Sequence, residues 1–261
     1  MLVSWTTVFI DLPAVGYRDG LEFWLAVTGG SASPVRGPEG EFLTVLPPSG
    51  DAYLRVQRVR DGEGGAHLDL HVTEPLEDAA DRARSLGARL RHAEPGLVVL
   101  ESPGGFGFCL VPTGSESTVP GPTTVEGLSS RLDQLCLDIP APAFDAERDF
   151  WATLTGWRLD EEPGSEFAVL HRPPGIPARL LLQRLDRAEP GRPVRAHLDL
   201  AAGADREALA ERHVALGARF VARFPQWIVL TDPAGRLYCL TRRDPVTGVS
   251  RPDWAERGPN G

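Results

Sequence analysis

Two short segments carry the residues best suited to chemistry. His67, Asp69 and His71 alternate in the sequence HLDLH, and His197 with Asp199 repeats that spacing. Side chains two residues apart on a β-strand share one face and lie roughly 6.6 Å apart. A carboxylate beside an imidazole can fix its tautomer, so His67 with Asp69, and His197 with Asp199, are candidate catalytic acid–base pairs. The alternative is that these side chains only satisfy each other's hydrogen bonds.

Further polar side chains are expected on neighbouring strands. Arg55 and Gln57 alternate onto one face, as do Leu181 and Gln183. An arginine in a cavity favours an anionic or carboxylate-bearing ligand, whereas a structural Arg55 would pair with Asp69 or Asp11. Both interpretations of Arg55 stay open. Asp11 and Asp138 each stand before a proline-containing turn, which predicts that they cap a loop or the following helix.

The two segments belong to an internal duplication. A shift of 130 residues aligns 66–111 with 196–241 without a gap, and 19 of these 46 positions are identical. Short motifs earlier in the two copies match as well, among them IDLP with LDIP and the two FW pairs. Repeats at a fixed period indicate a repeated structural unit. We therefore predict two domains, 1–112 and 132–243, joined by a flexible Pro/Gly/Ser/Thr-rich linker at 113–131 and followed by a polar tail at 244–261.

Periodicity in the second copy alternates between strand and helix. Asp145 is expected to cap a helix that buries Phe150 and Trp151 and ends at Gly156. Short strands are predicted at 166–171 and 179–185. The HLDL strand, a helix over 205–216 and three further strands complete the copy. Each domain is thus predicted to contain two strand–helix–strand–strand–strand units, which places the chain in the α+β class.

Composition excludes several classes of function. The formal net charge of −9 repels nucleic-acid phosphates, and all 27 basic residues are arginines, so a Schiff-base or P-loop lysine is excluded. The three cysteines occur singly, as is typical of a reduced cytosolic chain. Residues 1–10 lack a basic region and a long apolar region, and no stretch of 18 apolar residues occurs elsewhere, so neither a signal peptide nor a membrane span is expected. We expect a cytoplasmic protein with neither nucleic acid nor membrane as a partner.

The order of elements, a histidine opening each fifth strand, and the repeated words LGAR and DPAGRLYCL/SPGGFGFCL resemble the vicinal oxygen chelate superfamily. That superfamily includes glyoxalase I, extradiol dioxygenases, fosfomycin resistance enzymes and bleomycin resistance proteins. The resemblance covers both copies. It implies that each domain is a glyoxalase-like, cupped eight-stranded sheet made of two βαβββ units, with helices on the convex face and a ligand cavity on the concave face.

The resemblance also implies where metal ligands would stand, on the first, fourth, fifth and eighth strands. The matching positions are Thr7, Arg55, His67 and Cys109 in the first copy, and Gln134, Leu181, His197 and Cys239 in the second. Only the histidine is a family ligand in both copies. Because an open catalytic metal site needs about three firm protein ligands, we expect no obligatory metal or other cofactor. The fallback metal set is Gln134, His197 and Cys239.

We therefore expect a protein whose concave cavities bind a small organic molecule, for example to sequester a drug-like or metabolic compound. One alternative is a lyase, isomerase or dioxygenase that uses a divalent metal or a His/Asp pair, and another is a non-catalytic scaffold or regulatory protein. The chain is expected to act as a monomer that is an internal pseudo-dimer, or as a homodimer. The expected pocket residues are Thr7, Arg55, Gln57, His67, Asp69, His71, Gln134, Gln183, His197, Asp199 and Cys239.

Overall fold

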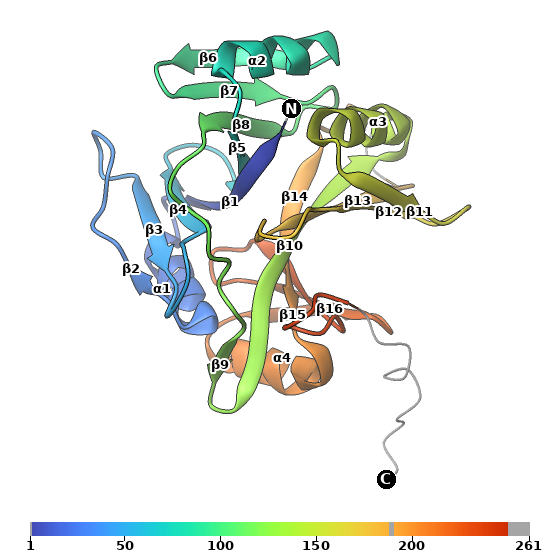
Figure 1. Ribbon diagram of the computed structural model, residues 1–261. Coiled ribbons are helices and arrows are strands. Elements are labelled where there is room, and N and C mark those ends of the chain that lie inside the picture. Colours follow the sequence, from blue (N-terminus) through green and yellow to red (C-terminus); the bar gives the residue numbers. More distant parts are fainter. Residues whose placement is uncertain (1, 188–190, 250–261) are drawn as a thin grey trace.

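The computed structural model of the protein describes residues 2–187 and 191–249, and both copies are built from the same elements (Figure 1). The alternation of apolar and polar residues produces the strands, and apolar residues at helical spacing produce the helices. The first copy contains β1 (Val3–Pro13), α1 (Tyr17–Thr28), β2 (Ser31–Ala32), β3 (Phe42–Leu46), β4 (Leu54–Val59), β5 (Gly65–Val72), α2 (Leu76–Ser85), β6 (Arg89–Glu94), β7 (Leu97–Glu101) and β8 (Gly107–Pro112).

The second copy repeats this order after a short strand, β9 (Thr123–Val125). Its elements are β10 (Leu128–Pro140), α3 (Phe144–Thr155), β11 (Arg158–Glu161), β12 (Phe167–His171), β13 (Arg179–Leu185), β14 (Arg195–Ala201), α4 (Arg206–Ala215), β15 (Arg219–Arg223), β16 (Trp227–Thr231) and β17 (Leu237–Thr241). The α+β class and the two βαβββ units in each copy are confirmed. The expected capping role of Asp145 is wrong, because α3 already begins at Phe144 and the Asp145 carboxylate pairs with Arg148 at 2.9 Å.

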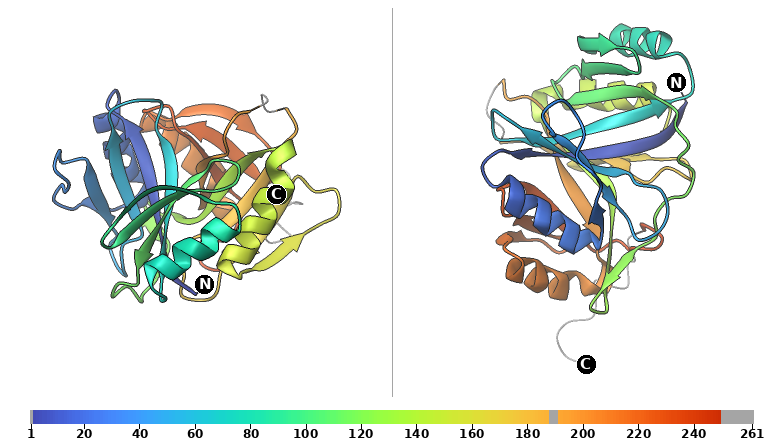
Figure 2. Two further views of the ribbon diagram at one scale, coloured as in Figure 1. Left: turned by 90° about the horizontal axis from the view of Figure 1, so that it is seen from above. Right: turned by 90° about the vertical axis from the view of Figure 1, so that its left-hand side faces the viewer.

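Each copy forms one curved mixed sheet (Figure 2). The strand orders are β2-β3-β4-β1-β5-β8-β7-β6 and β11-β12-β13-β10-β14-β17-β16-β15, and β9 pairs with β10 at the side of the second sheet. The two units of a copy meet where β1 runs antiparallel to β5, and where β10 runs antiparallel to β14. The HLDL segments therefore lie at the centre of their sheets.

The first helix of each copy packs against the last strand of the other copy. In α1, Phe23 and Trp24 contact the Tyr238 ring of β17, with ring centroids 5.7 and 5.3 Å apart. In α3, Trp151 contacts the Phe108 ring of β8 at 5.1 Å. Helices α1 and α4 consequently lie side by side at one end of the molecule, and α2 and α3 at the other (Figures 1 and 2). Buried residues of both copies form one hydrophobic core.

Both tryptophans of the FW pairs are anchored by buried acids as well as by packing. The Trp24 indole N–H donates to Asp232 in the other copy at 2.8 Å. The Trp151 indole N–H donates to Glu147, whose other carboxylate oxygen accepts the N–H of Gly104. Burial raises the pKa of both carboxyls, although these hydrogen bonds oppose the rise. Both indoles are fully buried, and the burial expected for Trp151 agrees with these contacts.

The segment 113–131 crosses from one sheet to the other. Asp51 accepts the backbone N–H groups of Ser117 and Thr118, each at 2.8 Å, and the end of the segment joins β9 to β10. The domain boundaries and the flexibility of the linker stay predictions. Of the predicted polar tail, residues 250–261 lie outside the described residues, while Asp244 closes a turn by accepting the N–H groups of Val246 and Thr247.

Candidate functional site

The histidine that opens the fifth strand of each copy is held by an aspartate from the first strand. His67 Nδ1 lies 2.9 Å from Asp11 Oδ2, and His197 Nδ1 lies 2.9 Å from Asp138 Oδ2. Beside this pair in the first copy, Gly64 packs closely on the Asp11 backbone, because a Cβ at its φ of +71° would lie 2.1 Å from the Asp11 carbonyl oxygen. The expected capping role of Asp11 and Asp138 is therefore wrong. Each aspartate instead orients an imidazole by accepting its Nδ1–H.

The second copy holds an open cavity of about 560 Å³ on the concave face of its sheet. One wall is aromatic. The ring of Trp227 on β16 stacks on Phe224, with centroids 4.8 Å apart and planes 21° apart, and Phe167 on β12 meets Trp227 edge-on at 5.6 Å. Flat apolar surfaces of this kind suit a planar organic group.

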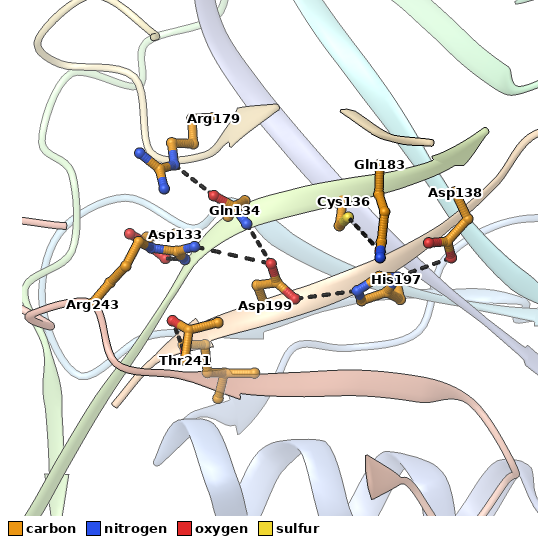
Figure 3. Close-up of polar contacts among 11 residues, drawn as sticks. Asp133, Gln134, Cys136, Asp138, Arg179, Gln183, His197, Asp199, Thr241 and Arg243 are labelled. Carbon is orange, nitrogen blue, oxygen red and sulfur yellow. Dashed lines mark hydrogen bonds and ion pairs between the residues drawn. The ribbon is translucent and has the colours of Figure 1, made fainter. Parts of the chain in front are cut away.

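The opposite wall is a chain of polar contacts centred on His197 (Figure 3). His197 Nε2 lies 3.4 Å from Asp199 Oδ1, so each ring nitrogen faces a carboxylate. Asp199 also accepts the amide N–H of Gln134, and the Gln134 carbonyl accepts Arg179 Nε–H at 2.6 Å. The polar chain thus runs from Arg179 through Gln134, Asp199 and His197 to Asp138.

The charges along this chain stabilise one another. Burial opposes protonation of His197, but the side chains of Cys136, Asp138 and Asp199 together outweigh burial and hold the pKa of His197 well above its ordinary value. Burial likewise opposes the charge on Asp199, yet His197 and Arg243 outweigh it and lower the pKa of Asp199. The raised pKa favours the protonated form of His197, whose ring nitrogens each face a carboxylate.

The first copy has a matching cavity of about 590 Å³. His67 stacks on Phe9, with ring centroids 4.2 Å and planes 17° apart. Arg55 lies 3.8 Å from Asp69 and also 5.7 Å from the centre of the Phe9 ring. Of the two interpretations of Arg55, the structure thus shows the pairing with Asp69. Burial raises the pKa of Asp69 despite His67 and Arg55, so this carboxyl ionises less readily than Asp199.

The structure places the expected pocket residues in three groups. Residues that line the first cavity are Arg55, Gln57, His67 and Asp69, and residues that line the second are Gln134, Gln183, His197, Asp199 and Cys239. Thr7 and His71 lie outside the lining of the first cavity. Both are buried, Thr7 Oγ1 lies 2.9 Å from His71 Nε2, and Glu116 of the crossing segment lies 3.9 Å from His71 Nδ1. They fill the end of that sheet.

Several residues of the second cavity were not identified from the sequence. Phe167 and Phe224, which form the aromatic wall together with Trp227, are two of them. Arg179 could have been found by alternation, because it lies two positions before Leu181 on β13. Arg243 follows the last strand and has no matching residue type in the first copy, so no pattern indicated it.

Three groups of side chains could present metal-ligand atoms within 4.8 Å of one another. They are His67, Asp69 and Cys109; Cys136, Asp138 and His197; and His197, Asp199 and Cys239. Two members of the fallback set, His197 and Cys239, belong to the third group together with Asp199. Gln134, the remaining member of that set, donates its amide N–H to Asp199.

The charges around these groups do not fit a resident divalent cation. In two of the three groups a guanidinium lies beside the carboxylate that would bind the metal, with Arg55 at 3.8 Å from Asp69 and Arg243 at 3.9 Å from Asp199. A metal on His197 would also displace a proton that two carboxylates stabilise. Burial raises the pKa of the Cys239 thiol to about 11, which keeps it protonated.

Comparisons with known proteins agree with the fold. A family model described as "Glyoxalase-like domain" matches residues 7–111 and 134–241. No curated protein matches the sequence significantly. Among the described residues, no helix has the length and apolar character needed to cross a bilayer.

Solved structures with a similar fold include several enzymes, one of them bound to Mn(II). The Mn(II)-bound glyoxalase from Novosphingobium aromaticivorans has 12% identity and a TM-score of 0.61, over 96% of this chain and 86% of that one. Homoprotocatechuate 2,3-dioxygenase from Arthrobacter globiformis has 15% identity and a TM-score of 0.61, over 97% and 82%. A mutant of 4-hydroxymandelate synthase from Streptomyces coelicolor has 14% identity and a TM-score of 0.55, over 95% and 94%. At these identities the likeness concerns the fold alone.

Proposed function

Because both halves of the chain belong to the glyoxalase-like domain family of the vicinal oxygen chelate superfamily, we propose that the protein binds a small organic molecule in its second cavity without an obligatory metal. The observation that carries this proposal is the pairing of an aromatic wall with a converging polar wall around about 560 Å³. Small-molecule sites typically combine an apolar lining with a few placed polar groups in a cavity of this size.

The two walls would divide the recognition of a ligand. Trp227, Phe224 and Phe167 offer flat apolar surface to a planar body. His197 and Asp199 offer a hydrogen-bond donor and an acceptor from the facing strand. The guanidinium groups beside Asp69 and Asp199 supply the positive charge that a metal would otherwise bring to these carboxylates, and this supports binding without a metal.

A binding experiment with a neutral planar probe tests the proposal. Naphthalene-2-carboxamide, titrated by calorimetry, should bind the wild-type protein and should bind Trp227→Ala about tenfold or more weakly, because an aromatic anchor is removed. Phe220→Ala is the matched control, since Phe220 is exposed on the neighbouring strand β15 and does not line the cavity. Equal affinity for Trp227→Ala and wild type, or no binding to either, would contradict the proposal.

Elemental analysis of the purified protein tests the metal-free part of the proposal separately. We expect less than about 0.1 equivalent of nickel, zinc, manganese or iron per chain, because protonated His197 and a guanidinium occupy the electrostatic position of a cation. A stoichiometric metal that is lost in His197→Gln would overturn it.

A second candidate function is proton transfer in a lyase or isomerase reaction. The observation that favours it is the position of His197, a carboxylate-flanked imidazolium that lines the cavity with a 12% exposed side chain. Such a group can act as a general acid. For an enzyme of this kind, His197→Gln would abolish turnover of the substrate while the protein still bound it, whereas a pure binding protein would show no turnover in either form.

A further inference from the structure

One end of the second cavity is unusually rich in arginine. The guanidinium groups there belong to Arg131, Arg172, Arg179 and Arg243, and the carboxylates that interact with them belong to Asp133 and Asp199. Arg179 and Arg243 line the cavity. This local excess of positive charge contrasts with the net charge of −9 for the whole chain. Clustered arginines that their own acids do not balance are typical of sites for anionic groups.

In the described parts of the chain, three of these guanidinium groups lack either a salt bridge or a hydrogen-bond partner for one nitrogen. Arg179 donates its Nε–H to the Gln134 amide, a neutral group, and forms no salt bridge within the part of the chain that the structure describes. Arg243 is 5% exposed, and its Nε, like that of Arg131, is buried without a hydrogen-bond partner. Burial, followed by repulsion from Arg243, lowers the pKa of Arg179 to about 10. An anion placed here would relieve that repulsion.

The first copy provides an internal comparison, because its matching positions carry no arginine. Strand register places Tyr53 where the second copy has Arg179, and the 130-residue shift places Thr113 where it has Arg243. The Tyr53 hydroxyl donates to the Leu132 carbonyl of the second copy, and Tyr53 does not line the first cavity. The arginine end is therefore a feature of the second copy and not a requirement of the fold.

A second difference between the copies lies at the same end of the sheet. His71 fills this position in the first copy, and the shift places Ala201 there in the second. Gln134 and Arg243 line the second cavity, whereas their counterparts Thr7 and Thr113 do not line the first.

We propose that Arg179 and Arg243 form a subsite for the anionic group of the ligand, so that the second cavity takes an organic anion with a planar apolar body. The inference rests on the proposed function and adds the charge of the ligand to it. A planar guanidinium suits the paired oxygens of a carboxylate or a phosphate ester. The anionic group would lie at the arginine end, and the apolar body would contact Trp227 and its neighbours.

Two probes of nearly the same shape separate charge from apolar packing. Naphthalene-2-carboxylate carries one negative charge, and naphthalene-2-carboxamide carries none. Calorimetry should show that wild type binds the carboxylate at least about tenfold more tightly, as expected for hydrogen bonds to charged groups. 1-Naphthyl phosphate serves as a third arm, and a preference for it over the carboxylate would assign the subsite to phosphate esters.

Substitutions of two arginines on β13 test whether Arg179 causes the preference for the anionic probe. Arg179→Gln should abolish it and should still fold, because a glutamine amide can also donate to Gln134. Arg179→Lys should retain part of the preference, since the charge remains. The matched control is Arg184→Gln, because Arg184 lies on the same strand but points to the opposite face, over the Phe144 ring of α3.

The outcomes distinguish the subsite from the proposed function. If both probes bind wild type equally, or if Arg179→Gln keeps the preference for the anion, the subsite is overturned while the proposed function stands. If neither naphthalene probe binds, both fail. Preference for the anion in wild type and Arg184→Gln, together with its loss in Arg179→Gln, supports the subsite.

Discussion

Removal of the Asp138 charge should destabilise the protein in a pH-dependent way. In Asp138→Asn, His197 loses a charged hydrogen bond of 2.9 Å, and both side chains are largely buried, at 12% and 20% exposure. A hydrogen bond to a charged group contributes about 1.5–3 kcal/mol. We therefore expect Asp138→Asn to lower the free energy of unfolding by about this amount at about pH 6, where His197 is protonated in the native wild type.

The sign of the pH dependence follows from the direction of the pKa shift. The pKa of His197 is raised in the folded state above its ordinary value of 6.5. Its ion pair therefore contributes fully below that ordinary value and is lost as pH rises through the raised pKa of the folded state. The difference between wild type and Asp138→Asn should shrink in the same direction, which urea unfolding at about pH 6 and about pH 9 would measure.

A matched surface pair provides the control for this experiment. Asp160 lies 3.3 Å from His171 Nε2, but these side chains are 58% and 34% exposed. Asp160→Asn should change the free energy of unfolding by less than about 0.5 kcal/mol, as is usual for exposed pairs. Equal effects of the two substitutions, or a loss in Asp138→Asn that does not depend on pH, would refute the assignment of His197 as a buried imidazolium.

Two further predictions concern the core and the thiols. Trp24→Phe should cost about 1.5–3 kcal/mol more in urea unfolding than Trp5→Phe, because Trp24 bonds the buried Asp232 carboxylate whereas the buried Trp5 indole N–H has no partner; equal losses would contradict the role of that bond. The three cysteines are buried and the pKa of Cys239 is raised to about 11, so iodoacetamide at about pH 8 should leave the native thiols unlabelled in mass spectra while urea exposes all three.

The fold could be predicted from the sequence because the sequence contains two copies of the same pattern of strands and helices. Strand β13 has the bounds predicted for it, and Gly156 ends α3 in the left-handed conformation, with φ at +67°. Short edge strands such as β11 were not identified, since its four residues carry little periodicity. The exchange of α1 and α3 between the copies was not predicted either, because it depends on contacts between residues more than 40 positions apart.

The site was predicted less completely than the fold, for a physical reason. Alternation correctly places His67 with Asp69, and His197 with Asp199, on one face of a strand. The partners of the histidine Nδ1 atoms come from an adjacent strand, and strand pairing is not visible in a local pattern. The repeat did hold a usable signal, because Asp11 and Asp138 occupy equivalent places in the words IDLP and LDIP.

The two copies reach the same charge balance with arginines from different places. Asp69 is paired with Arg55 from β4, two strands away within its own sheet, while Asp199 is paired with Arg243, which follows β17. The position that matches Arg55 is Leu181, and the one that matches Arg243 is Thr113, so neither arginine is repeated. Both copies therefore place a guanidinium next to the same buried aspartate, but the arginine that supplies it comes from a different position in each copy. A buried carboxylate is stable only with a positive charge nearby. In each cavity the guanidinium supplies that charge, which a divalent cation would otherwise supply.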